Sequence, residues 1–179
     1  MRVPLINLRR LYEDLKPDID AAIGSVLNSG RFILGDVVAQ LEQTLAQYVG
    51  TSYALGVASG TDALLLALRA IGVGQGDFVI TTTFTFFATP EVIIRLGATP
   101  IFVDIEPQTY NIDPEHLAIV IKHLPPSVRS RLKAIMPVHL YGQSADMDEI
   151  MDIATKYEIP AVSYTHLRAH ETRHDLVCR

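Results

Sequence analysis

The stretch DFVITTTFTFFATPEVIIRLGATPIFVDI, residues 77–105, contains the pattern that decides the fold. Two short apolar runs, 77–82 and 100–105, enclose a segment with helical spacing, 88–97. Neither run alternates between polar and apolar residues, so we expect both faces of each strand to be covered. The stretch therefore predicts two parallel strands joined by a crossover helix.

The same alternation extends to both sides of this stretch. We expect further helices over residues 11–28, 36–48, 61–72, 113–124 and 145–158, and further strands over 53–59, over 132–139 and from Ile159 onward. Strands that alternate with helices are typical of βαβ units. The sequence thus predicts an α/β fold, a three-layer sandwich with a mostly parallel sheet.

The overall composition excludes several classes of protein. A net charge of −5 over 179 residues argues against a nucleic-acid surface, which needs a basic stripe. No apolar run approaches the roughly 20 residues that span a bilayer, and residues 1–15 show no secretory signal. The single cysteine, Cys178, excludes an internal disulfide. We expect a cytoplasmic protein without nucleic-acid or membrane partners.

The pattern breaks after Val162. The segment SYTHLRAHETRHDLVCR, residues 163–179, holds three of the six histidines and the only cysteine, and its few apolar residues keep no regular period. It resembles translated cloning or adaptor sequence. We therefore predict an ordered domain over residues 1–162 and an artefactual or disordered tail over residues 163–179.

The tail contains HETRH, a match to the H-E-x-x-H motif of zinc proteases. On a helix, His170 and His174 would share one face, and Glu171 would act as general base on a zinc-bound water. A zinc site of this kind also needs a third ligand and a substrate cleft, and neither follows in the sequence. We predict no metal site; a zinc hydrolase is the alternative that this motif alone supports.

In open α/β sheets, ligands bind beyond the carboxyl ends of the strands, often at helix N-termini. The segment ASGTDAL, residues 58–64, lies at such a position. Gly60 would let the backbone approach a phosphate, the N–H groups of Thr61 and Asp62 would point outward, and the hydroxyls of Ser59 and Thr61 could add donors. The alternative is a tight turn with an ordinary Ser or Thr N-cap.

Two further strand ends carry aromatic or polar residues. Residues 84–87 hold three phenylalanines, one of which could present its ring to a planar ligand; the alternative is core packing. His139, Tyr141 and Gln143 follow another predicted strand, where a lone histidine is more often structural than catalytic. Three such strand ends in a row suggest a single site.

These segments resemble, in order and spacing, the DegT/DnrJ-type sugar aminotransferases, which are pyridoxal-phosphate enzymes of the aspartate-aminotransferase fold (fold type I). The resemblance runs from about Val3 to Val162, over the amino-terminal part of the family's large domain. It is carried by SGRFILG, ASGTDALLLAL, GDFVITTTFTFFAT, GATPIFVDIEPQTYNIDP and MPVHLYGQSADMD.

The resemblance implies a role for each candidate residue. Gly60–Thr61–Asp62 would hold the phosphate of pyridoxal 5'-phosphate, and Phe86 would stack on its ring. Ser59, His139 and Tyr141 would lie at the edge of the substrate site. The implied reaction moves an amino group, usually from glutamate, to a keto group of a nucleotide-linked deoxysugar. The full-length parent would be a homodimer.

Two features of the family are missing. The family has an acidic residue after the strand corresponding to IPAV, and further on a lysine that bonds to the cofactor and moves the proton. Here Val162 leads to Ser163, and none of the lysines fits that role; they are Lys16, Lys122, Lys133 and Lys156. We therefore predict an aminotransferase fragment with no catalytic lysine that is inactive as given. The alternative is a non-catalytic regulatory or cofactor-binding relative.

Overall fold

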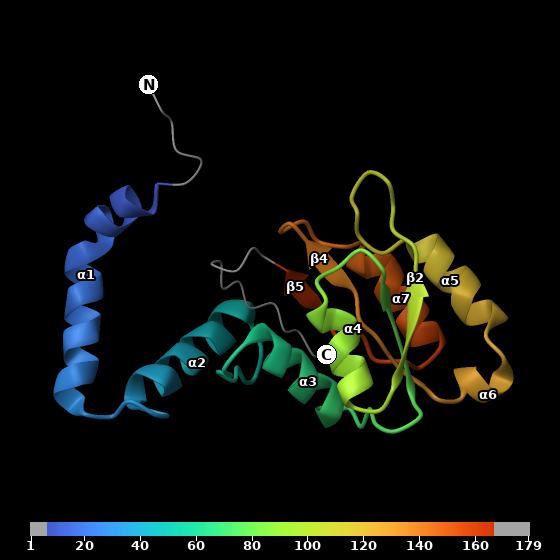
Figure 1. Cartoon of the computed structure of the whole chain (residues 1–179), viewed down its shortest axis with the longest axis horizontal. Coiled ribbons are helices and arrows are strands. Elements are labelled where there is room, and N and C mark those ends of the chain that lie inside the picture. The colour runs from blue at the N-terminus through green and yellow to red at the C-terminus, as the bar shows by residue number, and fades with distance from the viewer. Residues whose placement is uncertain (1–6, 167–179) are drawn as a thin grey trace. The chain divides into compact units, whose positions relative to one another are not determined.

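The computed structural model describes residues 7–166, which fall into an amino-terminal unit ending at Gly56 and a larger unit beginning at Val57 (Figure 1). The elements of the first unit are α1 (Leu8–Ser29) and α2 (Asp36–Val49). Those of the second are α3 (Gly60–Ala70), β1 (Phe78–Thr82), α4 (Ala88–Arg95), β2 (Thr99–Val103), α5 (Pro114–His123), α6 (Pro126–Arg129), β3 (Leu132–Ile135), β4 (Val138–Leu140), α7 (Met147–Lys156) and β5 (Tyr164–His166).

The amino-terminal unit consists of two helices with well-defined ends. The Asn7 side chain accepts a hydrogen bond from the Arg10 N–H and caps α1. Gly30 and Gly50 end α1 and α2 with φ angles of 65° and 76°, a left-handed conformation that glycine adopts without strain. Ala46 is the one buried residue of these two helices. Tertiary packing therefore contributes little to either helix within this unit.

The strand predicted over residues 53–59 is wrong, because this segment forms no strand in the structure. A strand needs a partner for its backbone N–H and C=O groups, and no described segment pairs with it. The Gly56 N–H instead donates to the Glu42 carboxylate at 2.7 Å. Tyr53 and Leu55, which a covered strand would bury, are exposed.

The sheet of the larger unit is parallel, with the order β2-β1-β3. In the register, Val79 of β1 lies opposite Pro100 on one side and Ala134 on the other. β2 is an edge strand that pairs only with β1 among the described residues. Because the Thr99 N–H donates to the Asp77 carbonyl at 2.8 Å, the nitrogen of Pro100 faces away from β1.

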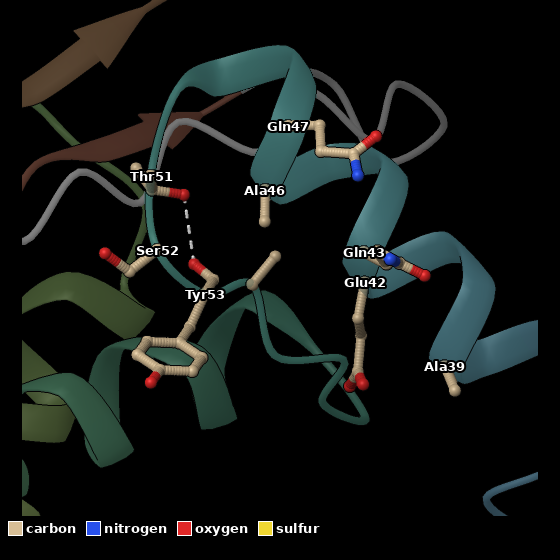
Figure 2. Close-up of a pocket in the computed structure, with 9 residues that line it drawn as sticks. Ala39, Glu42, Gln43, Ala46, Gln47, Thr51, Ser52 and Tyr53 are labelled. Carbon is tan, nitrogen blue, oxygen red and sulfur yellow. Dashed lines mark hydrogen bonds between the residues drawn. The ribbon is translucent and has the colours of Figure 1, made fainter.

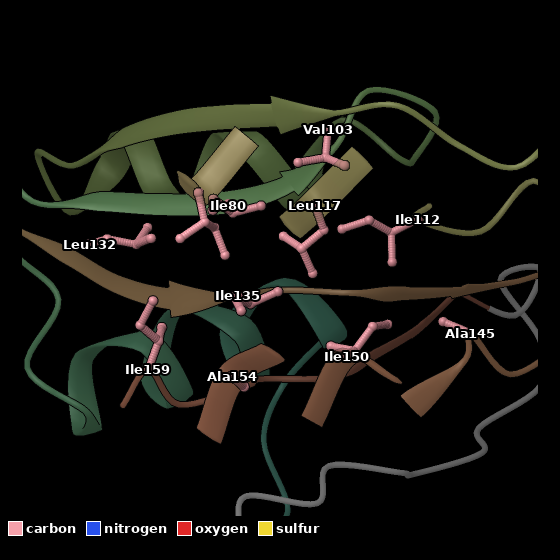
Figure 3. Packing of buried hydrophobic residues seen from close by; sticks show 11 residues of the cluster. Ile80, Val103, Ile112, Leu117, Leu132, Ile135, Ala145, Ile150, Ala154 and Ile159 are labelled. Atoms are coloured by element: carbon pink, nitrogen blue, oxygen red, sulfur yellow. The ribbon is translucent and has the colours of Figure 1, made fainter. Parts of the chain in front are cut away.

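Successive residues of β1 point to opposite faces of the sheet, and each face is covered by helices. Val79 packs with α3 and α4, together with Leu68 and Ile93. Ile80 packs with α5 and α7, together with Leu117 and Ile150 (Figure 3). Two separate cores on the two faces confirm the three-layer sandwich.

The strand predicted over residues 132–139 is divided in two. β3 ends at Ile135 and β4 begins at Val138, with Pro137 between them. A proline has no N–H to donate to a sheet ladder, so the chain changes its pairing there. β4 pairs in parallel with β5, and the Tyr164 N–H donates to the Pro137 carbonyl at 3.0 Å.

β5 lies within residues 163–179, which the sequence assigned to the tail. Residues 164–166 complete the ladder of β4 and Ser163 is buried, while the division of the chain at Val162 stays a prediction. Apolar periodicity cannot reveal so short a strand, since three residues give less than two periods. The HETRH motif and the rest of the tail lie outside the described residues.

Candidate functional site

Ser59 caps α3 at the carboxyl edge of the sheet. Its backbone is extended, and its Oγ accepts the Asp62 N–H at 3.1 Å and lies 3.0 Å from the Asp62 carboxylate. The Ser59 carbonyl accepts the Ala63 N–H at 2.9 Å. Two of the N–H groups at this helix end are therefore satisfied within the chain. The expectation that the Asp62 N–H points outward is wrong, because the serine hydroxyl occupies it.

The remaining donors are the N–H groups of Gly60 and Thr61. Within residues 7–166 neither has an acceptor, since both precede the first intrahelical hydrogen bond. Gly60 is exposed and Thr61 is partly exposed. Two outward N–H groups at the positive end of a helix make a site suited to an anion such as a phosphate.

Tyr164 forms one wall beside this helix start. A Cβ added to Gly60 would lie 3.8 Å from Tyr164 Cε2, an ordinary van der Waals distance. Tyr164 is partly buried against the α3/α4 core, and burial raises the pKa of its phenol above the usual value of about 10. The phenol therefore stays neutral at physiological pH.

The loop between β1 and α4 carries the predicted stacking residue. Phe86 is 52% exposed, and its carbonyl accepts the Thr89 N–H at the start of α4. The neighbouring Phe84 lies 5.7 Å, centroid to centroid, from the ring of Tyr110 in the loop after β2. None of the three phenylalanines is buried.

His139 lies on the other face of the sheet. It is buried in β4, and its Nδ1 accepts the Ala145 N–H at 2.9 Å. Ala145 belongs to the α5/α7 core, whereas Tyr164, opposite Val138 in the register, packs on the α3/α4 core. With Nδ1 occupied by a backbone amide, the structural interpretation of this histidine fits better than a catalytic one.

Tyr141 lies in a tight turn directly after β4, and its side chain is 68% exposed. The turn is held by a residue that sequence reasoning missed. Asn111, only 2% exposed, bonds to the backbone of residues 140, 143 and 144. A buried asparagine in a loop indicates that its side chain holds the backbone, but the burial of Asn111 cannot be read from the sequence.

Three lysines belong to the larger unit, and all lie at the edge opposite the start of α3. Lys122 and Lys156 are in the last turns of α5 and α7, and Lys133 is the second residue of β3. In a parallel α/β fold, helices that follow strands run back toward the strands' amino ends. These lysines therefore lie away from the carboxyl edge of the sheet.

The amino-terminal unit contains a separate open pocket of about 440 Å³ between α2 and residues 51–54 (Figure 2). Its one ionisable carboxylate, Glu42, is bonded to the Gly56 N–H. The Thr51 hydroxyl is bonded to the Tyr53 carbonyl at 3.0 Å, as the dashed line in Figure 2 shows. The lining offers no group of converging side chains for chemistry.

Residues 7–166 contain no group of three or more His, Cys, Asp or Glu side chains placed to hold a metal ion. In the same part of the chain, no helix has the length and apolar character needed to cross a membrane.

Comparison with known proteins gives relatives over nearly the whole chain. The chain is 48% identical over 160 residues to the UDP-2-acetamido-2-deoxy-3-oxo-D-glucuronate aminotransferase of Pseudomonas aeruginosa, covering 89% of this chain and 43% of the relative. It is also 48% identical over 162 residues to a pleiotropic regulatory protein of Geobacillus stearothermophilus, covering 90% of this chain and 42% of the relative. The chain thus spans less than half the length of these relatives.

Solved structures give the same result. The crystal structure of DesV from S. venezuelae, in complex with a ketimine intermediate, superposes with a TM-score of 0.82 at 41% identity, over 90% of this chain and 42% of DesV. An aminotransferase from Brucella abortus superposes with a TM-score of 0.84 at 36% identity. The model of the DegT/DnrJ/EryC1/StrS aminotransferase family matches residues 13–165. The chain therefore belongs to this aminotransferase family, as its sequence motifs predicted.

Proposed function

We propose that this chain is the amino-terminal part of a pyridoxal-phosphate-dependent aminotransferase. The enzyme would transfer an amino group from glutamate, the donor that the family resemblance implies, to a keto group of a nucleotide-linked deoxysugar. The observation that carries the proposal is the family match over residues 13–165 together with the open N-terminus of α3. Because the chain spans under half of its relatives, the activity belongs to the full-length parent.

The residues at the α3 end fit the phosphate of the cofactor. The outward N–H groups of Gly60 and Thr61 would bind phosphate oxygens, and the Thr61 hydroxyl could add a donor. The protein has room for a Cβ at position 60, so packing does not require a glycine there. The absence of a side chain at Gly60 leaves the approach to these N–H groups open. Phe86 would offer its half-exposed ring to the pyridine. When bound, pyridoxal phosphate supplies an electron sink and carries the amino group.

The residues for proton transfer are not at this edge. Tyr164, beside Gly60, is a neutral phenol and would not supply the negative charge that pairs with a pyridinium nitrogen. The lysines of the larger unit lie at the opposite edge. We therefore propose that this chain binds the cofactor through its phosphate, without a covalent bond, and does not transfer amino groups.

The test measures binding and covalent attachment separately. We expect equilibrium dialysis to show saturable pyridoxal phosphate binding that inorganic phosphate competes away. After borohydride reduction, intact-mass spectrometry should show no stoichiometric addition of the cofactor, and peptide mapping should show no preferred lysine. Binding that phosphate does not weaken, or a single lysine labelled stoichiometrically, would contradict the proposal.

A regulatory or cofactor-binding relative is the second candidate. The observation that favours it is the 48% identity to the pleiotropic regulatory protein of Geobacillus stearothermophilus. The two candidates differ in the full-length parent: an aminotransferase converts glutamate to 2-oxoglutarate with a keto-sugar nucleotide, and a regulator does not. Homodimerisation of the parent and a cytoplasmic location stay predictions.

A further inference from the structure

Both the nitrogen and the oxygen of the Asn111 carboxamide form hydrogen bonds with the backbone of one loop that is distant in the sequence. Its Nδ2 donates to the carbonyls of Gln143 and Ser144, both at 3.2 Å. Its Oδ1 accepts the Leu140 N–H at 2.9 Å. The side chain is almost completely buried, and so is its partner Leu140, so breaking this last bond leaves a buried backbone group without a partner.

The bonds enclose a turn with an unusual backbone. The Gln143 N–H donates to the Leu140 carbonyl at 3.0 Å, and the two central residues, Tyr141 and Gly142, have φ angles of 54° and 82°. Two successive positive φ angles closed by this bond are the signature of a type I′ turn. The conformation suits Gly142, but it strains Tyr141, whose Cβ crowds the backbone.

Hydrogen bonds hold the backbone on both sides of the strained turn. Asn111 holds residues 140, 143 and 144, and His139 holds Ala145 through its Nδ1. Tyr110, immediately before Asn111, also has a positive φ, 60°, and its ring lies near that of Phe84. The loops after β1, β2 and β4 are therefore linked at the carboxyl edge of the sheet.

We infer that Asn111 is a positioning residue that forces Tyr141 into its strained conformation and fixes the tyrosine at the ligand edge. The side chain of Tyr141 is exposed, so packing of that side chain does not hold its strained backbone. The surrounding hydrogen bonds hold it instead, and they thereby fix the position of the residue. Tyr141 directly follows β4. It comes about three residues after Val138, which lies opposite Tyr164, and this corresponds to on the order of 10 Å along the strand direction. The inference rests on the proposed function only for the identity of the ligand.

A double-mutant cycle without ligand tests the inference. In the native background, Tyr141→Gly relieves the strain and should raise the folding equilibrium constant about fivefold, measured by urea unfolding. In the Asn111→Ala background the turn is released, so the same substitution should give no gain. Leu117→Ala is the control: it removes a buried side chain of the same core without touching the turn, and the gain from Tyr141→Gly should persist there. Equal gains in the native and Asn111→Ala backgrounds would overturn the inference.

A local reporter keeps the test decisive if Asn111→Ala is too unstable for unfolding curves. The chain has no tryptophan, so Tyr141→Trp introduces a unique fluorophore at the turn. Its anisotropy should fall when Asn111→Ser is added and stay unchanged with Leu117→Ala. Unchanged anisotropy with Asn111→Ser would also overturn the inference. Neither measurement uses pyridoxal phosphate, so failure here is distinct from failure of the dialysis experiment.

Discussion

The ring of Tyr164 lies beside the first residue of α3, 3.8 Å from where a Gly60 side chain would begin. The contact joins β5, whose residues come after the predicted domain end, to the helix start that is proposed to hold phosphate. It also shows that the protein itself has room for a Cβ at position 60. If alanine at position 60 weakens ligand binding, the effect therefore does not come from a clash within the protein.

Gly60→Pro and Gly60→Ala form a matched pair for the phosphate site. Proline suits the first position of a helix, and Ser59 before it already has the extended backbone that proline requires. Both variants should unfold at nearly the native urea concentration. Proline removes the free N–H, so we expect its affinity for pyridoxal phosphate to fall about tenfold, equivalent to about 1.4 kcal/mol. Alanine keeps the N–H and should lose less. Native affinity in Gly60→Pro, measured by dialysis, would exclude this amide as a ligand.

The cap of α3 can be tested through stability. Ser59→Ala removes the acceptor of the Asp62 N–H and should lower the free energy of unfolding by about 1 kcal/mol. Ser59→Asn retains a capping oxygen and should remain close to native. Urea unfolding at neutral pH distinguishes them, and an alanine variant as stable as the asparagine variant would contradict a stabilising role for this cap.

Tyr164 predicts a loss of stability in alkali. Burial raises the pKa of this phenol in the folded chain, so the unfolded chain releases the proton first as the pH rises through about 10. The stabilising effect is complete below that pH and is lost as the pH rises through the folded-state pKa. Urea unfolding between pH 8 and 11 should therefore show a decline that is shallower in Tyr164→Phe. The control Tyr53→Phe changes a tyrosine that is 89% exposed and should leave the decline as it is.

Two truncations test where the folded part of the chain ends. Removing residues 163–179 deletes β5, with its bond to the Pro137 carbonyl and the partly buried Tyr164 ring. It should destabilise the chain by about 1 kcal/mol more than removing residues 167–179, as expected for the loss of a partly buried aromatic side chain. Thermal or urea unfolding gives the comparison. Equal stabilities would restore the domain end predicted at Val162.

The sequence predicted most of the larger unit, because the apolar runs that it identifies as strands pair with one another. The apolar runs of β1 and β2 lie opposite each other, and the helix between them covers one face, so local pattern and tertiary pairing agree. Residues 53–59 have a similar apolar composition but find no neighbouring strand among the described residues. Composition alone cannot report whether a partner exists.

The site was predicted in part for the same reason. The cap by Ser59 and the exposed glycine depend on adjacent residues, and the sequence shows both. The face on which His139 lies depends on how the chain continues after Pro137, where one predicted strand becomes two. The bonds of Asn111 span 29 to 33 residues, a range over which periodicity carries no information.

Pro100 makes the outer side of β2 a poor template for pairing with a further strand. At the outer side of β2, a strand from another molecule would seek alternate N–H groups, at positions 100 and 102. Proline supplies none at the first of these, so the incoming ladder would lack a hydrogen bond near its start. Misassembly of this chain through β2 is thereby discouraged by the backbone itself, even though Phe102 leaves an apolar side chain exposed on that strand.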